Sequence, residues 1–263
     1  MDQAAEIAAA SGDPNFMSSL ARGLAVIRGF SREKRSMTIS QLSQKTGIPR
    51  AAVRRCLYTL ERLGYVASED GRNFALRPKL LGLGHAYLSS TPLVVTAQPF
   101  LDRVSDAVNE SCSLAILDGA DILYVARSVS SRIISVALNV GSRLPAHCTS
   151  IGLVLLASLP PEALRAHLAR VELKRHTERT ITSRTALIEV LEEVRIQGYA
   201  VADNMMEVGV RSIAVPVHDA AGTVVAGMNV IIQSARGTVR EMKSLYLPHL
   251  QAAARELSAQ LVP

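Results

Sequence analysis

The sequence predicts a multidomain protein with an N-terminal winged helix-turn-helix, mainly α with a β wing, then a linker helix and a C-terminal α+β domain. Two observations predict this fold class. Residues 38–66 have the apolar spacing of two short helices around a Thr-Gly turn, and from Ser111 onward short apolar strands are grouped with helical segments. We expect a disordered tail followed by three parts, at residues 1–15, 16–77, 78–92 and 93–263.

The helix-turn-helix segment carries its own start and stop signals. Thr38 can cap the first helix while Gln41 reaches back to it, which is a capping-box spacing. Gly47 suits the tight turn, and Pro49 suits the first turn of the second helix. One set of side chains recurs at helical spacing and should pack inward: Val53, Leu57, Leu60 and Leu63. The opposite face is cationic and should point outward, with Arg50, Arg54, Arg55 and Tyr58.

The flanking segments complete a winged helix. Residues 68–73 contain an Asp-Gly turn between two short apolar runs, which predicts a hairpin with Arg72 at its tip. Upstream, residues 18–30 read as an amphipathic helix that turns Leu20, Leu24 and Ile27 toward the core.

The distribution of charge indicates double-stranded DNA as the partner. Residues 1–90 carry 13 Lys and Arg against 7 Asp and Glu, a net charge of +6, whereas residues 91–263 carry 16 against 16. A cationic excess confined to the domain with the candidate recognition helix is typical of phosphate binding, although charge runs are also found on merely solvated faces.

The rest of the chain reads as a helical linker and a mixed domain. We expect a helix at 79–90 and a second at 93–109 that Pro99 interrupts, with dimer packing through the leucine-rich linker. Strands are expected at 113–117, 122–126, 133–138, 199–202, 212–217 and 224–232. Helices are expected at 150–157, 161–169, 183–197 and 239–261.

Two stretches of the second domain look like binding sites. Residues 141–153 end a strand, turn at Pro145 and start a helix at Thr149 or Ser150, where free amides favour an anion. Residues 203–214 place polar side chains between two strands. The alternatives are an ordinary helix cap for the first stretch and a solvated loop for the second.

Several classes of function lack support in the sequence. We find no apolar run long enough to span a membrane and no signal peptide, so we expect a cytoplasmic protein. The motifs of nucleotide-binding, hydrolase and metal sites are absent, so we expect no enzyme, cofactor or metal. Cys56, Cys112 and Cys148 have no Cys-x-x-Cys pairing, which favours reduced thiols; a redox switch at Cys112 and Cys148 is the alternative.

Four separated motifs resemble the IclR family of bacterial transcription regulators. They lie at residues 19–27, 38–66, 144–152 and 198–217, and the likeness runs from about residue 15 to the C-terminus. Within the family, residues 143–150 and 210–217 look most like the branch that controls aromatic-acid catabolism, the protocatechuate, 4-hydroxybenzoate and β-ketoadipate regulators.

The resemblance implies a winged helix joined by a linker helix to a GAF-like effector-binding domain. Members act as homodimers or dimers of dimers on palindromic operator DNA, and a small carboxylate effector alters transcription. The residues that we expect at the DNA are Arg22, Thr38, Arg50, Ala51, Arg54, Arg55, Tyr58 and Arg72. Those that we expect at the effector are Arg132, His147, Thr149, Ser150, Gly152, Asp203, Glu207, Gly209, Arg211, Ser212 and Asn229.

Two positions depart from the family pattern. Members often carry an acidic residue where this chain has Met205, and commonly an arginine where it has Leu153. Both changes make the region more apolar, which favours an aromatic acid over a short oxo acid. A short oxo acid and a second domain that only oligomerises stay open as alternatives, as does the choice between repressor and activator, which would contact RNA polymerase.

Overall fold

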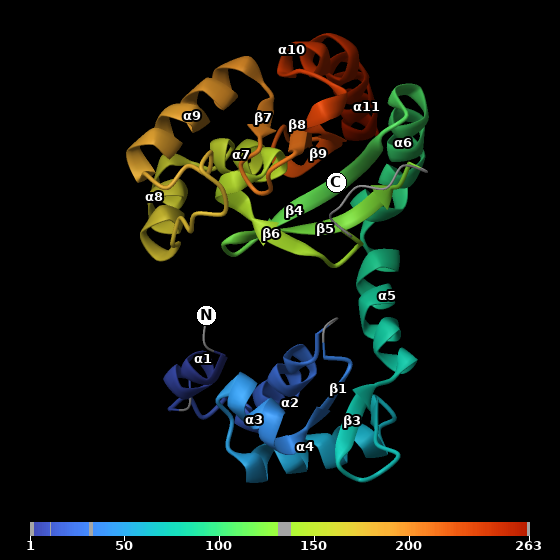
Figure 1. Ribbon diagram of the computed structural model, residues 1–263, viewed down its shortest axis with the longest axis vertical. Helices are drawn as coiled ribbons and strands as arrows, with labels where there is room; N and C mark the ends of the chain where they lie inside the picture. The colour runs from blue at the N-terminus through green and yellow to red at the C-terminus, as the bar shows by residue number, and fades with distance from the viewer. Residues whose placement is uncertain (1–2, 11, 32–33, 131–137, 262–263) are drawn as a thin grey trace. The chain divides into compact units, whose positions relative to one another are not determined.

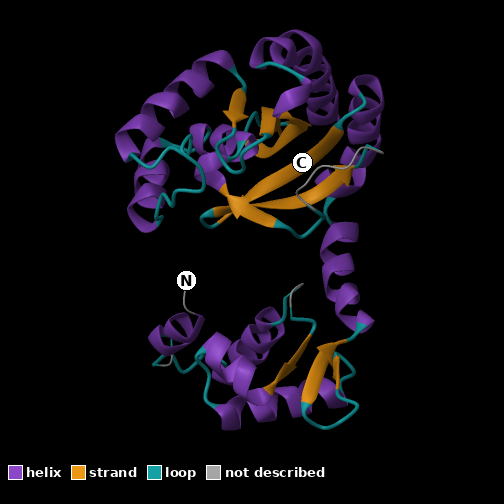
Figure 2. Ribbon diagram, viewed as in Figure 1, coloured by secondary structure: helices purple, strands orange, loops and turns teal. Residues whose placement is uncertain are grey.

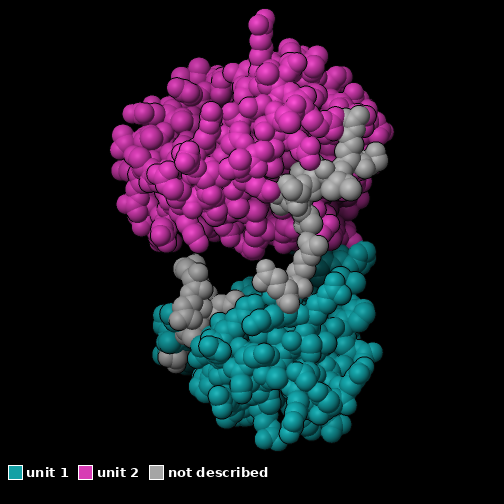
Figure 3. Space-filling model, viewed as in Figure 1, with its two compact units in different colours: residues 1–87 teal, residues 88–263 magenta. Residues whose placement is uncertain are grey.

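The computed structural model describes residues 3–10, 12–31, 34–130 and 138–261, and the chain divides into two compact units between Tyr87 and Leu88 (Figure 3). We describe each unit by itself. No helix among these residues combines the length and apolar character needed to cross a membrane.

Unit 1 is a winged helix-turn-helix, drawn in the blue colours of Figure 1. Its helices are α1 (Gln3–Ala9), α2 (Ser18–Gly29), α3 (Ile39–Thr46) and α4 (Arg50–Arg62). Its strands are β1 (Ser36–Thr38), β2 (Val66–Ala67) and β3 (Asn73–Leu76), which form an antiparallel sheet in the order β1-β3-β2. The helix-turn-helix and the wing are thus confirmed, and β1 is an additional strand that we did not predict.

The local signals of the helix-turn-helix act as predicted. Thr38 and Gln41 form a reciprocal capping box at the start of α3, and Gly47 ends that helix in the left-handed conformation with φ 70°. Val53, Leu57 and Leu60 are buried in the core of the unit. Pro49 is the N-cap of α4 and therefore lies just outside the helix.

Three expectations for unit 1 are wrong. The tail contains α1, whose Ile7 packs against the core because an apolar side chain gains from burial. On α2 the residues buried in the core are Ala25 and Val26, whereas Leu20 and Leu24, which we expected there, are 58% and 46% exposed. Leu63 is 51% exposed because α4 ends one residue before it and the chain turns at Gly64.

The linker is helical but begins later than predicted. A 3-10 turn at Pro78–Leu80 precedes α5 (Leu81–Ser90), and α5 has no buried residue. Lys79 fixes its start, because its Nζ donates to Leu63 O at 2.8 Å and lies over the Tyr65 ring.

Unit 2 is a six-stranded antiparallel sheet with helices on both faces (Figure 2). In sheet order the strands are β6 (Arg143–Pro145), β5 (Asp121–Ser128), β4 (Ser111–Asp118), β9 (Val224–Gln233), β8 (Val210–His218) and β7 (Ala200–Asp203). One face packs against α6 (Pro92–Val108) and α11 (Leu247–Gln260). The other packs against α7 (Ser150–Ala157), α8 (Pro161–Arg170) and α9 (Arg184–Gln197).

Most elements of unit 2 agree with the predicted ones. Pro99 lies inside a continuous α6 and does not interrupt it. The C-terminal helical segment starts at α10 (Val239–Glu241) and passes through a π-helical stretch at Met242–Tyr246 before α11. The strand expected at 133–138 falls largely on residues 131–137, outside the described part of the chain, and Leu138 itself is not in a strand.

Helix α7 is central to the unit because all its residues are buried. Gly152 permits its close approach to the preceding turn, since a Cβ at this position would lie 2.0 Å from Ala146 O. Gly227 has a similar role on β9, where a Cβ would lie 2.8 Å from the Ile151 side chain. The N-terminal end of α7 therefore lies directly against the sheet.

Candidate effector pocket and DNA-binding surface

The outward face of α4 is the cationic surface that the sequence predicts. Arg50, Ala51, Arg54, Arg55 and Tyr58 are all exposed, opposite the buried core positions of the same helix. The Arg62 guanidinium lies over the Tyr58 ring, 5.4 Å from its centroid. This face can offer guanidinium groups to phosphates and base edges.

Arg22 on α2 and Arg55 at the edge of the outward face of α4 lie beside a groove between these two helices. Both line an apolar groove of about 530 Å³ within unit 1, together with Leu20, Leu24 and Leu83. Burial raises the pKa of the Cys56 thiol in this groove, and the positive charges of Arg22 and Arg55 partly offset that rise. The two arginines thus lie at or beyond the edge of the face that presents Arg54.

Thr38 and Arg72 have different structural settings. The Thr38 hydroxyl accepts from Gln41 N at 3.3 Å in the capping box, so its observed role is to start α3. Arg72 is exposed in the wing turn, where the Asp70 carboxylate accepts from Arg72 N at 2.9 Å and Asn73 N at 2.7 Å. These hydrogen bonds hold the pKa of Asp70 well below its usual range, so the turn stays fixed at neutral pH.

Unit 2 holds a cavity of about 70 Å³ between the sheet and the N-terminal end of α7. This is several times the ~10–15 Å³ that a single water molecule needs. Its walls are mostly apolar, with Leu138, Leu144, Ala202, Met205, Met206, Val210 and Ile231. Polar groups enter from Tyr124, Arg127, Thr149, Glu207, Ser212 and Asn229.

A polar row crosses the three central strands beneath this cavity. Arg127 on β5 pairs in register with Ser113 on β4, and Ser113 pairs with Asn229 on β9. A β-bulge at Val125 shifts the alternation of β5, so that Tyr124 and Arg127 share one face of the sheet. Side chains at directly opposed positions on one face lie within contact distance.

The polar row contains several buried atoms that lack hydrogen-bond partners among the described residues. They are Arg127 Nε and Nη1, Ser113 Oγ, Asn229 Oδ1 and, at the start of α7, Ser150 Oγ. An enclosed guanidinium nitrogen without a partner costs free energy, so this arrangement favours an anionic ligand with additional hydrogen-bonding groups. Burial lowers the pKa of Arg127, and burial raises the pKa of Tyr124 to about 12, although the Arg127 charge and the Asn229 side chain oppose the latter rise.

Of the predicted effector residues, Thr149, Glu207, Ser212 and Asn229 line the cavity. Thr149 caps α7, because its Oγ1 accepts from Gly152 N at 3.2 Å. Four of the other predicted residues do not line it: His147, Ser150, Gly152 and Gly209. His147 and Ser150 are buried in the turn and at the start of the helix. Gly152 serves packing, and Gly209 adopts φ 88° in the loop before β8.

Arg211 and Asp203, also expected at the effector, do not line the cavity and are instead paired with each other. Arg211 Nε donates to Asp203 Oδ1 at 2.5 Å, and its Nη1 donates to Ser234 O at 2.8 Å and Gly237 O at 2.7 Å. Asp203 Oδ2 also accepts a hydrogen bond from Arg179 Nη1 at 3.2 Å. The reason is alternation along β8, since Val210 and Ser212 face the cavity and Arg211 lies between them. Arg132 falls outside the described residues.

Sequence reasoning missed Arg127, Ser113 and Tyr124. The pattern that could have revealed them is a charged residue, Arg127, near the end of an apolar strand and a serine, Ser113, within a neighbouring one. Both strands belong to a sheet that is covered by helices on each face. Buried charged residues are rare in such positions unless they have a partner.

The three cysteines are free thiols. Burial raises the pKa of Cys112 above its ordinary value, and burial raises the pKa of Cys148 to about 12. Both side chains are therefore neutral thiols at physiological pH, which disfavours the redox-switch alternative since the thiolate is the reactive form. Cys148 is nevertheless close to two histidines, a grouping considered below.

Comparison with known proteins identifies both units. Residues 19–70 match the IclR helix-turn-helix domain, and residues 85–259 match the bacterial transcriptional regulator IclR C-terminal domain. The chain is 54% identical to the Pca regulon regulatory protein of Pseudomonas putida, over 98% of this chain and 89% of that protein.

Solved structures of regulators share the fold. A transcriptional regulator from Rhodococcus sp. RHA1 superposes with a TM-score of 0.83 at 45% identity, covering 94% of this chain and 98% of that one. An IclR homologue from Microbacterium hydrocarbonoxydans, crystallised with 4-hydroxybenzoate, has a TM-score of 0.79 at 26% identity, covering 92% and 98%. The winged helix and these matches together show that the chain is a DNA-binding transcriptional regulator and belongs to the IclR family.

Proposed function

We propose that this regulator controls genes for the catabolism of aromatic compounds and that its effector is a small aromatic carboxylate bound beside Arg127. The observation that carries this proposal is that Arg127 Nε and Nη1 are enclosed and have no hydrogen-bond partner in the described part of the chain. A carboxylate in the cavity would accept a charge-assisted hydrogen bond from one of these guanidinium N–H groups. The names of the Pseudomonas relative and of the 4-hydroxybenzoate complex support the aromatic class.

The rest of the cavity suits an aromatic ring with polar substituents. Met205, Met206 and Ile231 supply apolar surface, while Ser113, Asn229 and Tyr124 offer hydroxyl and amide groups near the Arg127 end. A ring that carries hydroxyl groups could satisfy these atoms while its carboxylate pairs with Arg127. The mostly apolar walls disfavour a short oxo acid, which is the second candidate.

On the DNA side, we propose a homodimer, or a dimer of dimers, that binds a palindromic operator in the cytoplasm. Each α4 would enter a major groove, with successive grooves about 34 Å apart. Arg50 and Arg54 are proposed at or near base edges, with Ala51 and Tyr58 beside them, whereas Arg22, Arg55 and Arg72 are proposed at phosphates. The exposed apolar side chains of Leu81, Leu83 and Tyr87 on α5 support a dimer through the linker.

Effector binding would act by favouring one arrangement of the dimer over another. A typical coupling free energy of about 1–3 kcal/mol changes operator affinity roughly 5- to 150-fold. In an activator the same change would alter contacts with RNA polymerase.

The test is a thermal-shift screen of the full chain against protocatechuate, 4-hydroxybenzoate, β-ketoadipate, pyruvate and glyoxylate. A true effector at 100 times its dissociation constant stabilises the protein by about 2.7 kcal/mol, which raises the melting temperature measurably. We expect an aromatic acid to do so for the wild type and for Arg170→Ala, an exposed arginine on α8. A shift with glyoxylate or pyruvate alone would replace the aromatic class with a short oxo acid, and no shift with any compound would contradict the proposal.

A further inference from the structure

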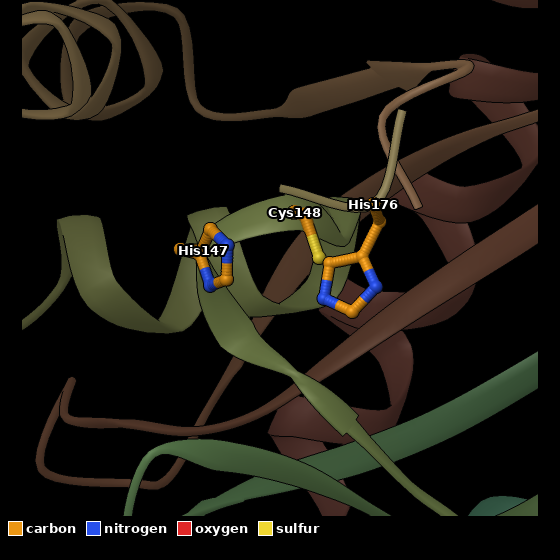
Figure 4. Close-up of side chains that lie close together, drawn as sticks. All are labelled: His147, Cys148 and His176. Atoms are coloured by element: carbon orange, nitrogen blue, oxygen red, sulfur yellow. The ribbon is translucent and has the colours of Figure 1, made fainter. Parts of the chain in front are cut away.

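We propose that His147, Cys148 and His176 form a site for a thiophilic d¹⁰ metal ion, Zn²⁺ or Cu⁺, next to the effector pocket. One ligand atom from each residue lies within 4.8 Å of the other two. Figure 4 shows the Cys148 sulfur between the two imidazole rings, whose centroids are 6.2 Å apart. Cys148 and Met206 also line the effector cavity, but the metal titration uses no effector, so either proposal can fail without the other.

The donor set is the one that these ions prefer. Imidazole and thiolate are the common ligands of Zn²⁺, and thiolate together with thioether selects Cu⁺. A coordinating cysteine loses its proton, so metal binding would release the Cys148 thiol proton to solvent. Zn–N bonds of about 2.0 Å and Zn–S bonds of about 2.3 Å put tetrahedral ligand atoms roughly 3.4–3.6 Å apart. The three donor atoms therefore need to approach one another by little more than about 1 Å, a change that side-chain rotation provides.

His147 has a buried ring nitrogen available for a metal. The side chain is 3% exposed, its Nε2 lies 3.1 Å from Lys174 O, and its Nδ1 is enclosed without a partner among the described residues. In the tautomer whose Nε2–H donates to Lys174 O, Nδ1 carries the lone pair that can coordinate a metal ion.

The chain holds the third ligand in place through a network of its own. His176 lies in the segment between α8 and α9, where Thr180 Oγ1 accepts from His176 N at 3.0 Å. Thr180 Oγ1 in turn donates to Met205 O at 2.7 Å, and Thr177 Oγ1 donates to Asn204 O at 2.6 Å. These hydrogen bonds connect the segment that carries His176 to the loop after β7, whose residues Met205, Met206 and Glu207 line the effector pocket.

The Met206 thioether should affect the affinity of the site for Cu⁺ but not its affinity for Zn²⁺. Its Sδ lies 3.4 Å from Cys148 Sγ, so a thioether is available as a fourth ligand. A thioether contributes to Cu⁺ binding and little to Zn²⁺ binding. Met206→Leu should thus weaken Cu⁺ and leave Zn²⁺ unchanged, because leucine keeps the apolar volume.

The experiment titrates the full-length protein with Co²⁺, a spectroscopic stand-in for Zn²⁺, and separately with Cu⁺ against a colorimetric chelator under reducing conditions. We expect binding of one ion per chain, displacement of bound Co²⁺ by Zn²⁺, and a sulfur-to-cobalt charge-transfer band that disappears in Cys148→Ser. His176→Ala, on the half-buried loop position, should weaken the affinity at least ~10-fold. Cys56→Ser, a cysteine of unit 1, should bind as the wild type does.

Circular dichroism shows whether each variant is folded, so loss of binding in an unfolded variant is not counted. Binding of Cu⁺ without any Co²⁺ band would assign the site to Cu⁺. Absence of both ions from folded wild-type protein, or a charge-transfer band that persists in Cys148→Ser, would overturn the proposal.

Discussion

Replacement of Arg127 by methionine should have opposite effects on effector binding and on stability. Arg127 Nε and Nη1 are enclosed beneath the cavity without a described partner. A hydrogen bond to a charged group contributes about 1.5–3 kcal/mol, so loss of the bond between Arg127 and the carboxylate costs up to about 3 kcal/mol. Loss of 3 kcal/mol weakens binding roughly 150-fold.

The unliganded protein should respond in the other direction. Methionine keeps much of the apolar stem and removes a charge that has no described partner, which relieves a desolvation cost. Since Arg127 is only half-buried, we expect a gain of about 1 kcal/mol, or about 2–4 °C in the melting temperature of a domain of this size.

Isothermal titration calorimetry measures the affinity, and thermal unfolding without ligand measures the stability. Arg170→Met is the matched control, because it removes an exposed arginine from the same unit and should change neither quantity. Wild-type affinity in Arg127→Met, or a lower melting temperature of its unliganded form, would refute the reasoning.

Three further predictions concern other parts of the molecule. Arg54→Ala should relax operator specificity at a cost of roughly 1–3 kcal/mol in the free energy of binding. Arg72→Ala should weaken binding to operator and random DNA alike and flatten the salt dependence of the affinity. Fluorescence anisotropy measures both affinities, and equal losses by both variants on both DNAs would contradict these roles. Gly152→Ala should destabilise unit 2 by about 1–3 kcal/mol because its Cβ meets Ala146 O. Gly82→Ala on α5, where a Cβ would meet nothing within 4 Å, should instead stabilise its helix by about 0.5–1 kcal/mol. Chemical denaturation measures both changes, and similar effects of the two variants would be evidence against the close approach at Gly152. Burial lowers the pKa of His147, so the folded chain binds fewer protons than the unfolded chain, and the free energy of unfolding should fall as pH drops through and below 6.5. His147→Gln should flatten that pH dependence more than His249→Gln, which changes an exposed histidine. An unchanged pH profile in His147→Gln would argue against a neutral buried His147.

The sequence predicted the elements whose causes are local. The capping box of Thr38 and Gln41, the left-handed Gly47 and the Asp-Gly turns depend on residues within a few positions of one another, and the structure confirms them. The inward spacing on α4 was also local, since Val53, Leu57 and Leu60 are one turn apart.

The errors came from contacts between distant residues. The predicted apolar face of α2 is only partly buried, because Ile27 packs against the core while Leu20 and Leu24 lie in a surface groove and Val26 is buried instead. Likewise, Arg211 looked free in sequence, yet its partners come from Asp203 and from the backbone of residues 234 and 237.

The principal residue of the pocket could not be found from alternation alone. The bulge at Val125 changes which face Arg127 occupies, and only the pairing of β5 with β4 reveals it. The grouping of His147 and Cys148 with His176 depends on a loop that returns from α8, so no spacing rule in the sequence predicts it.

A crystal structure of the full-length protein with 4-hydroxybenzoate or protocatechuate tests the central claim most directly. Our account predicts the carboxylate within hydrogen-bonding distance of Arg127 Nε or Nη1, with the ring against Met205 and Ile231. A ligand bound elsewhere, or a carboxylate held by Arg211 in place of its Asp203 partner, would contradict it.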